Sequence, residues 1–470
     1  MLTLAEVLDA TGGEGRGARA SIGDLRFSRV VVDSRAVTPG ALFVALKGQK
    51  HDGHAFVAQS LAHGAAGALV ERIPADCAWA LNPAAEGPPL IVVPSSQNAL
   101  AAMARYALDR HPNLEVVGIT GSLGKTTTKE VVASVLGAHR RVLKSEGNLN
   151  SEIGLPMTVL NGLDRPYDIA VLEMAMYQVG DIRLLARLAR PRVGVVTVVL
   201  PVHLERLGTI DRIQQAKQEL VEELPSNGVA VLNADDARVA EMATAASARV
   251  VRYGVSETAD VRAENIDSQG LRGVHFDLLH TGQRRRVHLP LLGAHSVHAA
   301  LAATAVAHEE GFSLSETAEA LQRLSPALRL LVVDGINGSR VIDDSYNASP
   351  ESVLAALNLL RELPGRRKIA VLGDMLELGS EEAPSHRRVG NRAAAVLDML
   401  VVYGPRSKIT ADEARRSGLA PEQVFEANSH DEIVERLREQ LRPGDDVLVK
   451  GSLAMGMSAV VRGIRAEGEA

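Results

Sequence analysis

The residues best suited to chemistry form a glycine-rich turn between an apolar run and a helix. Val116–Ile119 predicts a buried strand, and a helix is expected from about Thr126 to Leu136. The turn between them reads Thr120-Gly121-Ser122-Leu123-Gly124-Lys125-Thr126-Thr127. Backbone N–H groups of such a turn point inward and, with the helix N-terminus, make a nest for polyanionic phosphate. The sequence therefore predicts a phosphate-binding loop (P-loop) for a nucleoside triphosphate.

Two residues of this loop have distinct expected roles. Lys125 would neutralise the outer phosphates, and Thr126 would offer a hydroxyl to Mg²⁺. The spacing is not the full G-x-x-x-x-G-K-[ST], because Ile119 occupies the first glycine position. The shorter T-G-S-x-G-K-T-T form is present, and its place between a strand and a helix supports the same function.

Three further residues are candidates for metal or phosphate chemistry. Glu173 ends the predicted strand Ile169–Leu172, at the sheet edge where ligand sites gather, and its carboxylate can hold Mg²⁺ directly or through water. His203 follows the next predicted strand, Val193–Val199, although a loop histidine alone is weak evidence. Lys217 lies on a helical stretch, where a lysine considered alone is expected at the surface.

The elements that position these residues fall into three segments. A chain of 470 residues is too long for one hydrophobic core of ordinary size. At roughly 100–200 residues per domain, about three domains are expected. We expect them at residues 1–97, 98–313 and 314–470. The first contains short strands between Gly/Pro turns: Arg29–Asp33, Leu42–Leu46 and Leu90–Val93.

In the second and third segments strands alternate with helices, which predicts parallel, doubly wound sheets. The second adds the helix Leu100–Leu108, the strand Val229–Leu232, a strand-rich stretch at 250–292 and the helix His295–Glu310. The third is expected to contain the strands Arg340–Asp344, Ile369–Leu372, Met399–Tyr403 and Val447–Lys450, and the helices Ser349–Leu360, Ala393–Leu397 and Asp431–Leu441. The predicted fold class is α/β in three domains: a small N-terminal domain, a central P-loop ATPase-like parallel sheet and a C-terminal Rossmann-like domain.

Composition narrows the class of protein. The hydrophobic content of 46% and the charged content of 23% are those of a globular chain. A net charge of −6 gives no electrostatic reason to expect a nucleic-acid partner. The N-terminus does not resemble a signal peptide, and no apolar stretch approaches the roughly 18 residues of a membrane span. The single cysteine, Cys77, rules out an internal disulfide and fits a reducing cytoplasm.

Motifs along nearly the whole chain resemble the Mur ligase family. The P-loop, with its continuation to Glu130, is similar to the ATP loop of that family. The other matching segments follow the family's order: Asp33-Ser34-Arg35, Pro39–Gly48, Asp52-Gly53-His54, Gly147–Gly154, Asp343–Ala348, Gly373–Gly379 with His386, and Lys450-Gly451-Ser452. So many ordered matches make coincidence negligible.

The resemblance implies an activity with its substrates. The members that this chain most resembles use ATP to phosphorylate the terminal carboxylate of UDP-N-acetylmuramoyl-tripeptide. The amine of D-alanyl-D-alanine then attacks the acyl phosphate, and an amide, ADP and phosphate result. This reaction belongs to peptidoglycan precursor synthesis, so the resemblance implies a cytoplasmic enzyme, for which a monomer is the default.

The resemblance also implies roles at matching positions. Lys125 contacts the phosphates, Thr126 and Glu173 hold one Mg²⁺, and His203 serves a second Mg²⁺. Lys217 matches a lysine that family members carbamylate, which turns a cation into an anion that supports a metal. Arg329 matches an arginine brought to the phosphates from the C-terminal domain. The N-terminal domain is expected to bind the uridine nucleotide, and the residues assigned to the UDP substrate are Ser34, Arg35, Lys47, Asp52, His54, Asn148, Asn150 and Ser151.

The sequence departs from the family at positions where the resemblance implies contact with the adenine of ATP. The family helix reads His-Asn-x-x-Asn, whereas this chain has His295-Ser296-Val297-His298-Ala299. The usual arginine after Lys450-Gly451-Ser452 is Leu453. Either His298 or Ser296 takes over adenine recognition, or that role falls to Tyr346 and Asn347.

Two alternatives to an active ligase stay open. One is a degenerate homologue that binds ATP or the UDP precursor with little turnover, which the changes at 296, 299 and 453 suggest. The other is a related amide ligase such as folylpolyglutamate synthetase. Asp33-Ser34-Arg35 argues against the latter, because folate enzymes resemble the family only from the P-loop onward.

Overall fold

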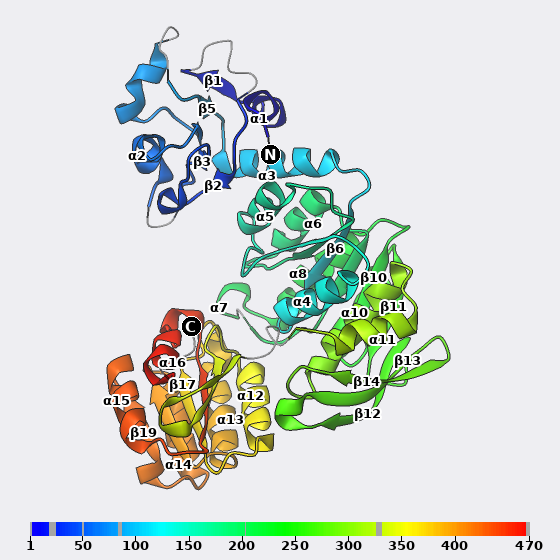
Figure 1. The fold of residues 1–470 in the computed structure, drawn as a ribbon, viewed down its shortest axis with the longest axis vertical. Coiled ribbons are helices and arrows are strands. Elements are labelled where there is room, and N and C mark those ends of the chain that lie inside the picture. The colour runs from blue at the N-terminus through cyan, green and yellow to red at the C-terminus, as the bar shows by residue number, and fades with distance from the viewer. Residues whose placement is uncertain are drawn as a thin grey trace.

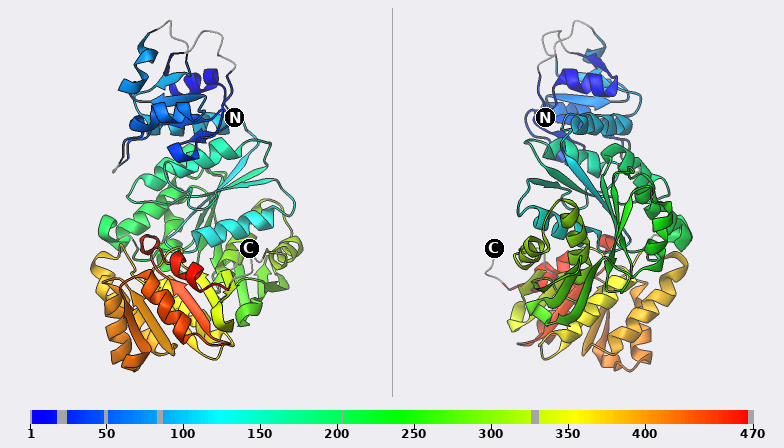
Figure 2. Two further views of the ribbon diagram at one scale, coloured as in Figure 1. Left: turned by 60° about the vertical axis from the view of Figure 1, so that its left-hand side comes forward. Right: turned by 90° about the vertical axis from the view of Figure 1, so that its right-hand side faces the viewer.

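The computed structural model describes residues 2–17, 25–48, 51–82, 87–202, 204–325 and 331–466. These residues form three β-sheets that follow one another along the long axis of the molecule (Figure 1). The N-terminal sheet lies at one end, the nine-stranded sheet in the middle and the C-terminal sheet at the other end, as further views also show (Figure 2). The predicted α/β fold class is confirmed.

The N-terminal sheet has five short strands in the order β1-β5-β4-β3-β2. The strands β2 to β5 run parallel, and β1 is antiparallel to β5. Their bounds are β1 Glu14–Arg16, β2 Val30–Val31, β3 Leu42–Val44, β4 Gly67–Val70 and β5 Leu90–Val92. The strand predicted at Arg29–Asp33 is shorter, because the Asp33 side chain caps a 3-10 turn at Ser34–Ala36.

The central sheet has nine strands in the order β14-β13-β12-β11-β10-β9-β6-β8-β7. The strands β6 to β12 run parallel, and β13 and β14 add an antiparallel edge. Their bounds are β6 Glu115–Thr120, β7 Val142–Lys144, β8 Ile169–Glu173, β9 Val193–Val196, β10 Val229–Asn233, β11 Arg249–Gly254, β12 Val261–Ser268, β13 Val274–His280 and β14 Gln283–Leu289. The strand-rich stretch expected at 250–292 is therefore an extension of this sheet.

The C-terminal sheet has six strands in the order β15-β16-β20-β17-β18-β19. Only β15 is antiparallel to its neighbour. The bounds are β15 Leu331–Asp334, β16 Arg340–Asp344, β17 Lys368–Gly373, β18 Met399–Tyr403, β19 Val424–Ala427 and β20 Asp446–Lys450. Four of these strands match the predicted ones, and β15 and β19 were not predicted.

Helices cover both faces of the two larger sheets. Their bounds are α1 Leu4–Thr11, α2 Val57–Ala62, α3 Ser96–Asp109, α4 Lys125–Leu136, α5 Gly154–Gly162, α6 Asp181–Ala189, α7 Leu204–Leu207, α8 Ile210–Glu222, α9 Ala237–Glu241, α10 Ser296–Glu309, α11 Leu314–Gln322, α12 Pro350–Glu362, α13 Glu382–Ala394, α14 Ser407–Arg416, α15 His430–Gln440 and α16 Ser458–Ile464. The helix predicted at Ala393–Leu397 is wrong. Only its first two residues lie in α13, which runs from Glu382 to Ala394 and buries small residues that give no strong apolar pattern.

Alternation along the central strands produces the two layers around the sheet. Val171 of β8 packs in the same cluster as Val131 of α4 and the residues of α10. Its neighbours Ala170 and Leu172 pack on the opposite face with α6 and α8. Successive side chains of a strand point to opposite faces, so an uninterrupted apolar run builds both layers at once.

The predicted boundary at 313 and 314 falls between α10 and α11. In the structure, Leu314, Ala318 and Leu321 of α11 are buried in the same cluster as β14 and α10. The helix therefore packs with the central sheet. We propose that the central domain extends through α11 and that the C-terminal domain begins after it.

Polar and apolar contacts join the three parts. The side chain of Asn161 on α5 accepts a hydrogen bond from the Val30 N–H at 2.8 Å and donates to the Val30 carbonyl at 3.0 Å. Ser268 Oγ at the end of β12 donates to Glu362 Oε2 of α12 at 2.6 Å. Leu292, which follows β14, is buried in the C-terminal core. The central sheet thus touches both neighbours.

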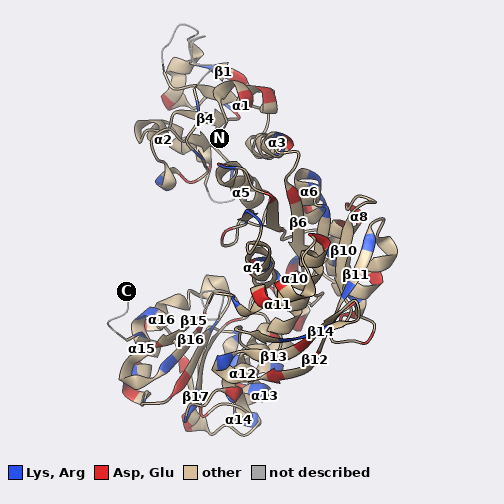
Figure 3. Cartoon of the chain, turned by 45° about the vertical axis from the view of Figure 1, so that its right-hand side comes forward, with Lys and Arg blue, Asp and Glu red and all other residues tan. Residues whose placement is uncertain are grey.

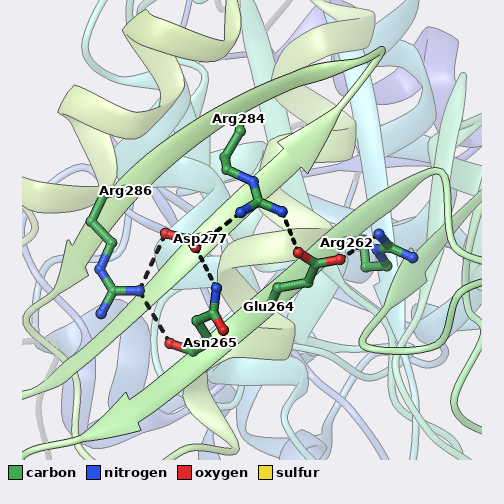
Figure 4. A network of polar contacts seen from close by, with 6 residues as sticks. All are labelled: Arg262, Glu264, Asn265, Asp277, Arg284 and Arg286. Atoms are coloured by element: carbon green, nitrogen blue, oxygen red, sulfur yellow. Dashed lines mark hydrogen bonds and ion pairs between the residues drawn. The ribbon is translucent and has the colours of Figure 1, made fainter.

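A polar network holds the antiparallel edge of the central sheet (Figure 4). Arg286 Nη1 donates to Asp277 Oδ1 at 3.2 Å and to the Asn265 carbonyl at 3.1 Å, while Asn265 Nδ2 donates to Asp277 Oδ2 at 2.7 Å. Asn265 has a φ of 49° where the register between β12 and β13 shifts. The network therefore stabilises a left-handed residue at a β-bulge.

Charges of both signs are interspersed on the helices in the view of Figure 3. Within the described ranges, no helix has the length and apolar character needed to cross a bilayer.

Candidate active site

The predicted phosphate loop connects β6 to α4, as expected. Gly121 has a φ of 148° and Gly124 a φ of 80°, values that L side chains rarely adopt. A Cβ atom at position 121 would come within 1.8 Å of Thr197 Oγ1. The segment after β9 passes so close to the loop that only glycine fits there.

Thr197 and Ser122 fasten the loop to this neighbouring segment. Thr197 Oγ1 donates to the Leu123 carbonyl at 2.7 Å. The N–H of Ser122 donates to the Val198 carbonyl at 2.7 Å, and Ser122 Oγ accepts from the N–H of Leu200 at 2.9 Å. The conformation of the loop is therefore set by β9 as well as by the strand and helix that flank it.

Lys125 is the first residue of α4, and its ammonium group lies against the loop. Its Nζ donates to the Gly121 carbonyl at 2.9 Å. Burial lowers the pKa of Lys125, and the nearby carboxylate of Glu173 opposes that shift. The side chain is thus held at the turn whose phosphate it is predicted to neutralise.

Glu173 is the last residue of β8 and is 1% exposed. Its Oε2 accepts a hydrogen bond from Thr126 Oγ1 at 2.9 Å, and its Oε1 accepts one from Asn150 Nδ2 at 2.8 Å. In the described part of the chain, no group of three His, Cys, Asp or Glu side chains could hold a metal ion.

Lys217 lies on α8 and is 2% exposed, although a helical lysine considered alone predicts a surface position. Burial lowers its pKa well below the usual range, and the positive charge of Lys125 lowers it further. Among the residues that the structure describes, none forms a hydrogen bond or ion pair with its Nζ. The amine of Lys217 is therefore buried beside the phosphate loop with no counter-charge among the described residues.

The C-terminal part reaches the same region through Tyr346. Burial and the nearby carboxylate of Glu173 both raise the pKa of this tyrosine. The carbonyl of its neighbour Asn347 accepts a hydrogen bond from Lys450 Nζ at 2.8 Å. His203 and Arg329 lie outside the described residues, so their roles at a second Mg²⁺ and at the phosphates stay predictions.

Most of the chain matches models of one protein family. Three family models match in order: Mur ligase family, catalytic domain, at residues 26–107; Mur ligase middle domain at 119–307; and Mur ligase, glutamate ligase domain, at 328–453. The UDP-N-acetylmuramoyl-tripeptide–D-alanyl-D-alanine ligase of Mycobacterium tuberculosis is 38% identical, with 99% of this chain and 98% of that protein covered. The chain belongs to the Mur ligase family.

Other relatives agree over the full length. The ligase of the same name from Escherichia coli is 34% identical and covers 99% of this chain. A crystal structure of MurF from Acinetobacter baumannii has a TM-score of 0.85 at 30% identity and covers 98% of each chain. MurF ligase from Thermotoga maritima in complex with ADP has a TM-score of 0.78 at 30% identity, with 93% of this chain and 97% of that chain covered.

The residues predicted for the UDP substrate fall into two groups. Asn148, Asn150 and Ser151 lie in the loop after β7, next to Glu173. The remaining predicted residues lie on the N-terminal part: Ser34, Arg35, Lys47, Asp52 and His54. The two groups therefore belong to different domains of this Mur ligase, and their contacts with a substrate stay predictions.

His54 and Arg35 are already engaged within the N-terminal part. His54 is 3% exposed, its Nδ1 lies 2.7 Å from Asp52 Oδ1, and its Nε2 accepts from the N–H of Glu71 at 2.9 Å. The hydrogen bonds from Arg35, from its side chain first and its N–H second, lower the pKa of Asp33 to about 2. The His54 ring thus positions its own loop, whereas the Arg35 side chain remains largely exposed.

The adenine end differs from the Mur ligase pattern in a way that the structure clarifies. Ser296 Oγ donates to the Gly293 carbonyl at 2.8 Å, and Ala299 is 6% exposed in the layer beneath the sheet. His298 keeps a partly exposed ring whose Nε2 lies 2.8 Å from Asp235 Oδ2. Of the two substitutes considered on α10, His298 alone retains a side chain that can face a base.

Two residues that organise the site were missed in the sequence. Thr197 was counted within an apolar strand, and Ser145 was given no role. Ser145 is fully buried, and its Oγ accepts a hydrogen bond from the N–H of Glu173 at 3.1 Å. The available signal was a hydroxyl residue at the carboxyl end of an apolar strand, where ligand sites of parallel sheets gather.

Replacing Thr197 with valine tests the support of the loop. The variant keeps the shape but leaves the Leu123 carbonyl without its donor, which costs about 1–3 kcal/mol. We expect Mg²⁺-ADP affinity, measured by calorimetry, to fall about tenfold. Thr304→Val is the matched control, because Thr304 is also buried and donates to the Ala300 carbonyl away from the loop. An equal loss of affinity in both variants would contradict a specific role for Thr197.

Proposed function

We propose that this chain is an ATP-dependent, ADP-forming ligase that joins D-alanyl-D-alanine to UDP-N-acetylmuramoyl-tripeptide. The observation that carries the proposal is the pair of hydrogen bonds that Glu173 accepts from Thr126 and Asn150, at 2.9 and 2.8 Å. They bring the phosphate loop and the predicted substrate loop to one carboxylate. Relatives named for this activity match the chain from end to end.

The reaction divides into two steps. A carboxylate oxygen of the tripeptide attacks the γ-phosphorus of ATP, and the bond from that phosphorus to the β,γ-bridging oxygen breaks to release ADP. The amine nitrogen of D-alanyl-D-alanine then attacks the acyl carbon, loses a proton, and the tetrahedral intermediate expels inorganic phosphate. Lys125 neutralises phosphate charge while the fixed loop orients it, so the enzyme contributes positioning and electrostatic stabilisation.

The residues present fit a magnesium ion. A bound Mg²⁺ would neutralise charge that develops on the transferred phosphoryl group. Thr126 and Glu173 would hold it, because a buried carboxylate beside a hydroxyl supplies the hard oxygen atoms that this ion prefers. His203 stays the proposed residue for a second Mg²⁺. We propose that the reaction takes place in the cytoplasm, because its substrates are ATP and a UDP-linked precursor.

A direct assay separates this function from its alternatives. Purified protein with UDP-N-acetylmuramoyl-tripeptide, D-alanyl-D-alanine and Mg²⁺-ATP should release phosphate and form the UDP-linked pentapeptide, detected by mass spectrometry. Leaving out either peptide substrate should stop both signals. Glu173→Gln keeps the size of the side chain but removes its charge, and it should lower kcat at least about 100-fold.

The outcomes that would contradict the function are distinct. Phosphate release at background level would favour a degenerate homologue that only binds its ligands. Turnover with a folate and glutamate in place of the peptide substrates would favour a folate enzyme. A folylpolyglutamate synthase of Mycobacterium tuberculosis has a TM-score of 0.61 at 20% identity and covers 79% of this chain, which is a likeness of fold alone.

We also propose that Lys217 is carbamylated. The reaction needs a neutral amine, since the nitrogen lone pair attacks the carbon of CO₂ and the nitrogen then loses a proton. Burial and the charge of Lys125 favour the neutral form by lowering the pKa of Lys217. The product is an anion, which would supply the counter-charge that this buried position lacks among the described residues.

Lys217→Ala tests the carbamate. The variant should be nearly inactive in the ligase assay, and short carboxylates such as acetate or propionate should restore part of the activity by filling the space with a negative charge. Lys408→Ala, which removes an exposed lysine of α14, is the control and should be unaffected. Full activity of Lys217→Ala without added carboxylate would exclude the role.

We further propose that His298 has taken the adenine-recognition role in this chain. Asp235 accepts a hydrogen bond from the His298 ring or forms an ion pair with it, and it also accepts from the N–H groups of Val255 and Ser256. The ring is therefore held by a fixed carboxylate at the start of α10. Ala299 cannot contribute, because its position is buried in the apolar layer.

Two substitutions on α10 test this assignment. His298→Ala should weaken ATP binding about five- to tenfold, whereas His308→Ala at the far end of the same helix should leave affinity unchanged. Restoring the family residue with Ala299→Asn should not tighten ATP binding, and it should lower the free energy of unfolding by about 1–3 kcal/mol, because an amide would enter an apolar layer. Tighter ATP binding by Ala299→Asn would contradict the assignment.

A further inference from the structure

The strand β7 ends with an altered hydrogen-bonding pattern next to Glu173. Lys144 of β7 pairs with Val171 of β8 in parallel register, and the N–H of Ser145 donates to the Val171 carbonyl at 3.1 Å. A continued parallel ladder would direct the N–H of Glu173 to the Ser145 carbonyl. Instead, that N–H donates to the side-chain Oγ of Ser145 at 3.1 Å.

Lys129 of α4 takes the carbonyl that leaves the ladder. Its Nζ donates to the Ser145 carbonyl at 2.6 Å and lies 3.0 Å from Glu130 Oε1. Lys129 and Ser145 are both fully buried. Because burying an ammonium group is costly unless it is paired, these two partners account for a lysine in the core. The Ser145 carbonyl therefore accepts from Lys129 and not from the N–H of Glu173. The Ser145 hydroxyl accepts from that N–H in its place.

This exchange has its consequence at the active site. After Ser145 the chain leaves the sheet and returns at Asn150, which donates to Glu173 Oε1 at 2.8 Å. The Asn150 carbonyl accepts from the N–H of Ala175 at 2.8 Å, directly after β8. The departure of the chain at Ser145 therefore decides where the Asn150 side chain meets Glu173.

We propose that Lys129 is a positioning residue that acts through Ser145 to fix Glu173 and the loop of Asn150. Its side chain is fully buried, so its effect on a bound ligand would pass through the backbone of β7 and β8. The identity of the ligands whose binding would change rests on the proposed function. The positioning of Glu173 and Asn150 does not.

Lys144 provides a matched comparison. It forms an ion pair with the same carboxylate, Glu130, from the end of β7. It does not contact the Ser145 carbonyl. Lys144→Met and Lys129→Met therefore each remove one positive charge from Glu130, and only Lys129→Met also releases that carbonyl.

The first experiment measures amide hydrogen exchange in the metal-free and nucleotide-free protein. Lys129→Met should speed exchange at least about tenfold in peptides that cover residues 143–152 and 171–176, with the C-terminal sheet unchanged. Ser145→Ala, a milder change, should affect the same peptides and keeps the test available if Lys129→Met does not fold. Unchanged exchange in both variants, or an equal effect of Lys144→Met, would overturn the proposal.

The second experiment measures nucleotide binding by calorimetry with and without Mg²⁺. Lys129→Met and Ser145→Ala should each reduce the enhancement of ADP binding by Mg²⁺ about tenfold, and should change binding in EDTA less than about twofold. Because the two residues act in series, the double variant should be no weaker than the weaker single variant. Additive losses would contradict action through Ser145. Absence of ADP binding by the unaltered protein would instead refute the proposed function and leave the exchange result standing.

Discussion

The two hydrogen bonds to the carboxylate of Glu173 depend on the order of strands in the central sheet. β6 lies between β9 and β8, and the connection from β6 to β7 passes over β8. The connection from β8 leads to β9 on the other side of β6. Such a reversal opens a crevice at the carboxyl ends of the strands, where ligands of doubly wound sheets bind. The loop before α4 enters this crevice, so Thr126 meets Glu173 across adjacent strands.

Two lysine side chains lie at this edge close to one carboxylate. Lys125 and Lys217 both have lowered pKa values, and Glu173 is the carboxylate between the phosphate loop and the substrate loop. A lysine whose pKa is lowered in the folded state binds fewer protons there than in the unfolded chain, so its cost to stability falls as pH rises. A polyphosphate, or a negative charge on Lys217, offsets the same cost at neutral pH. The two lysines therefore favour an anionic ligand at this edge of the sheet.

Patterns that depend on local sequence predicted much of this molecule. The glycine-rich turn, Glu173 at its strand end and the alternation of strands and helices are visible because each follows from short-range periodicity or a motif. Helix α13 was misplaced because its buried face consists of Ser, His, Val, Gly and Ala, which give a weak apolar signal. The hydrogen-bond partners of Thr197 and Ser145 and the burial of Lys217 were not predictable, since each depends on which segment packs alongside it.

Contacts between the central and C-terminal parts include two polar points, Ser268 against Glu362 and Arg206 against Glu377, together with the buried Leu292. The second point involves a residue in a left-handed conformation, because Glu377 has a φ of 63°. The phosphate loop is held within the central domain by β6, by α4 and by hydrogen bonds to the segment that follows β9. The Glu173 carboxylate raises the pKa of Tyr346, so the C-terminal part lies within electrostatic range of the proposed metal site, whose own geometry is set by the central sheet.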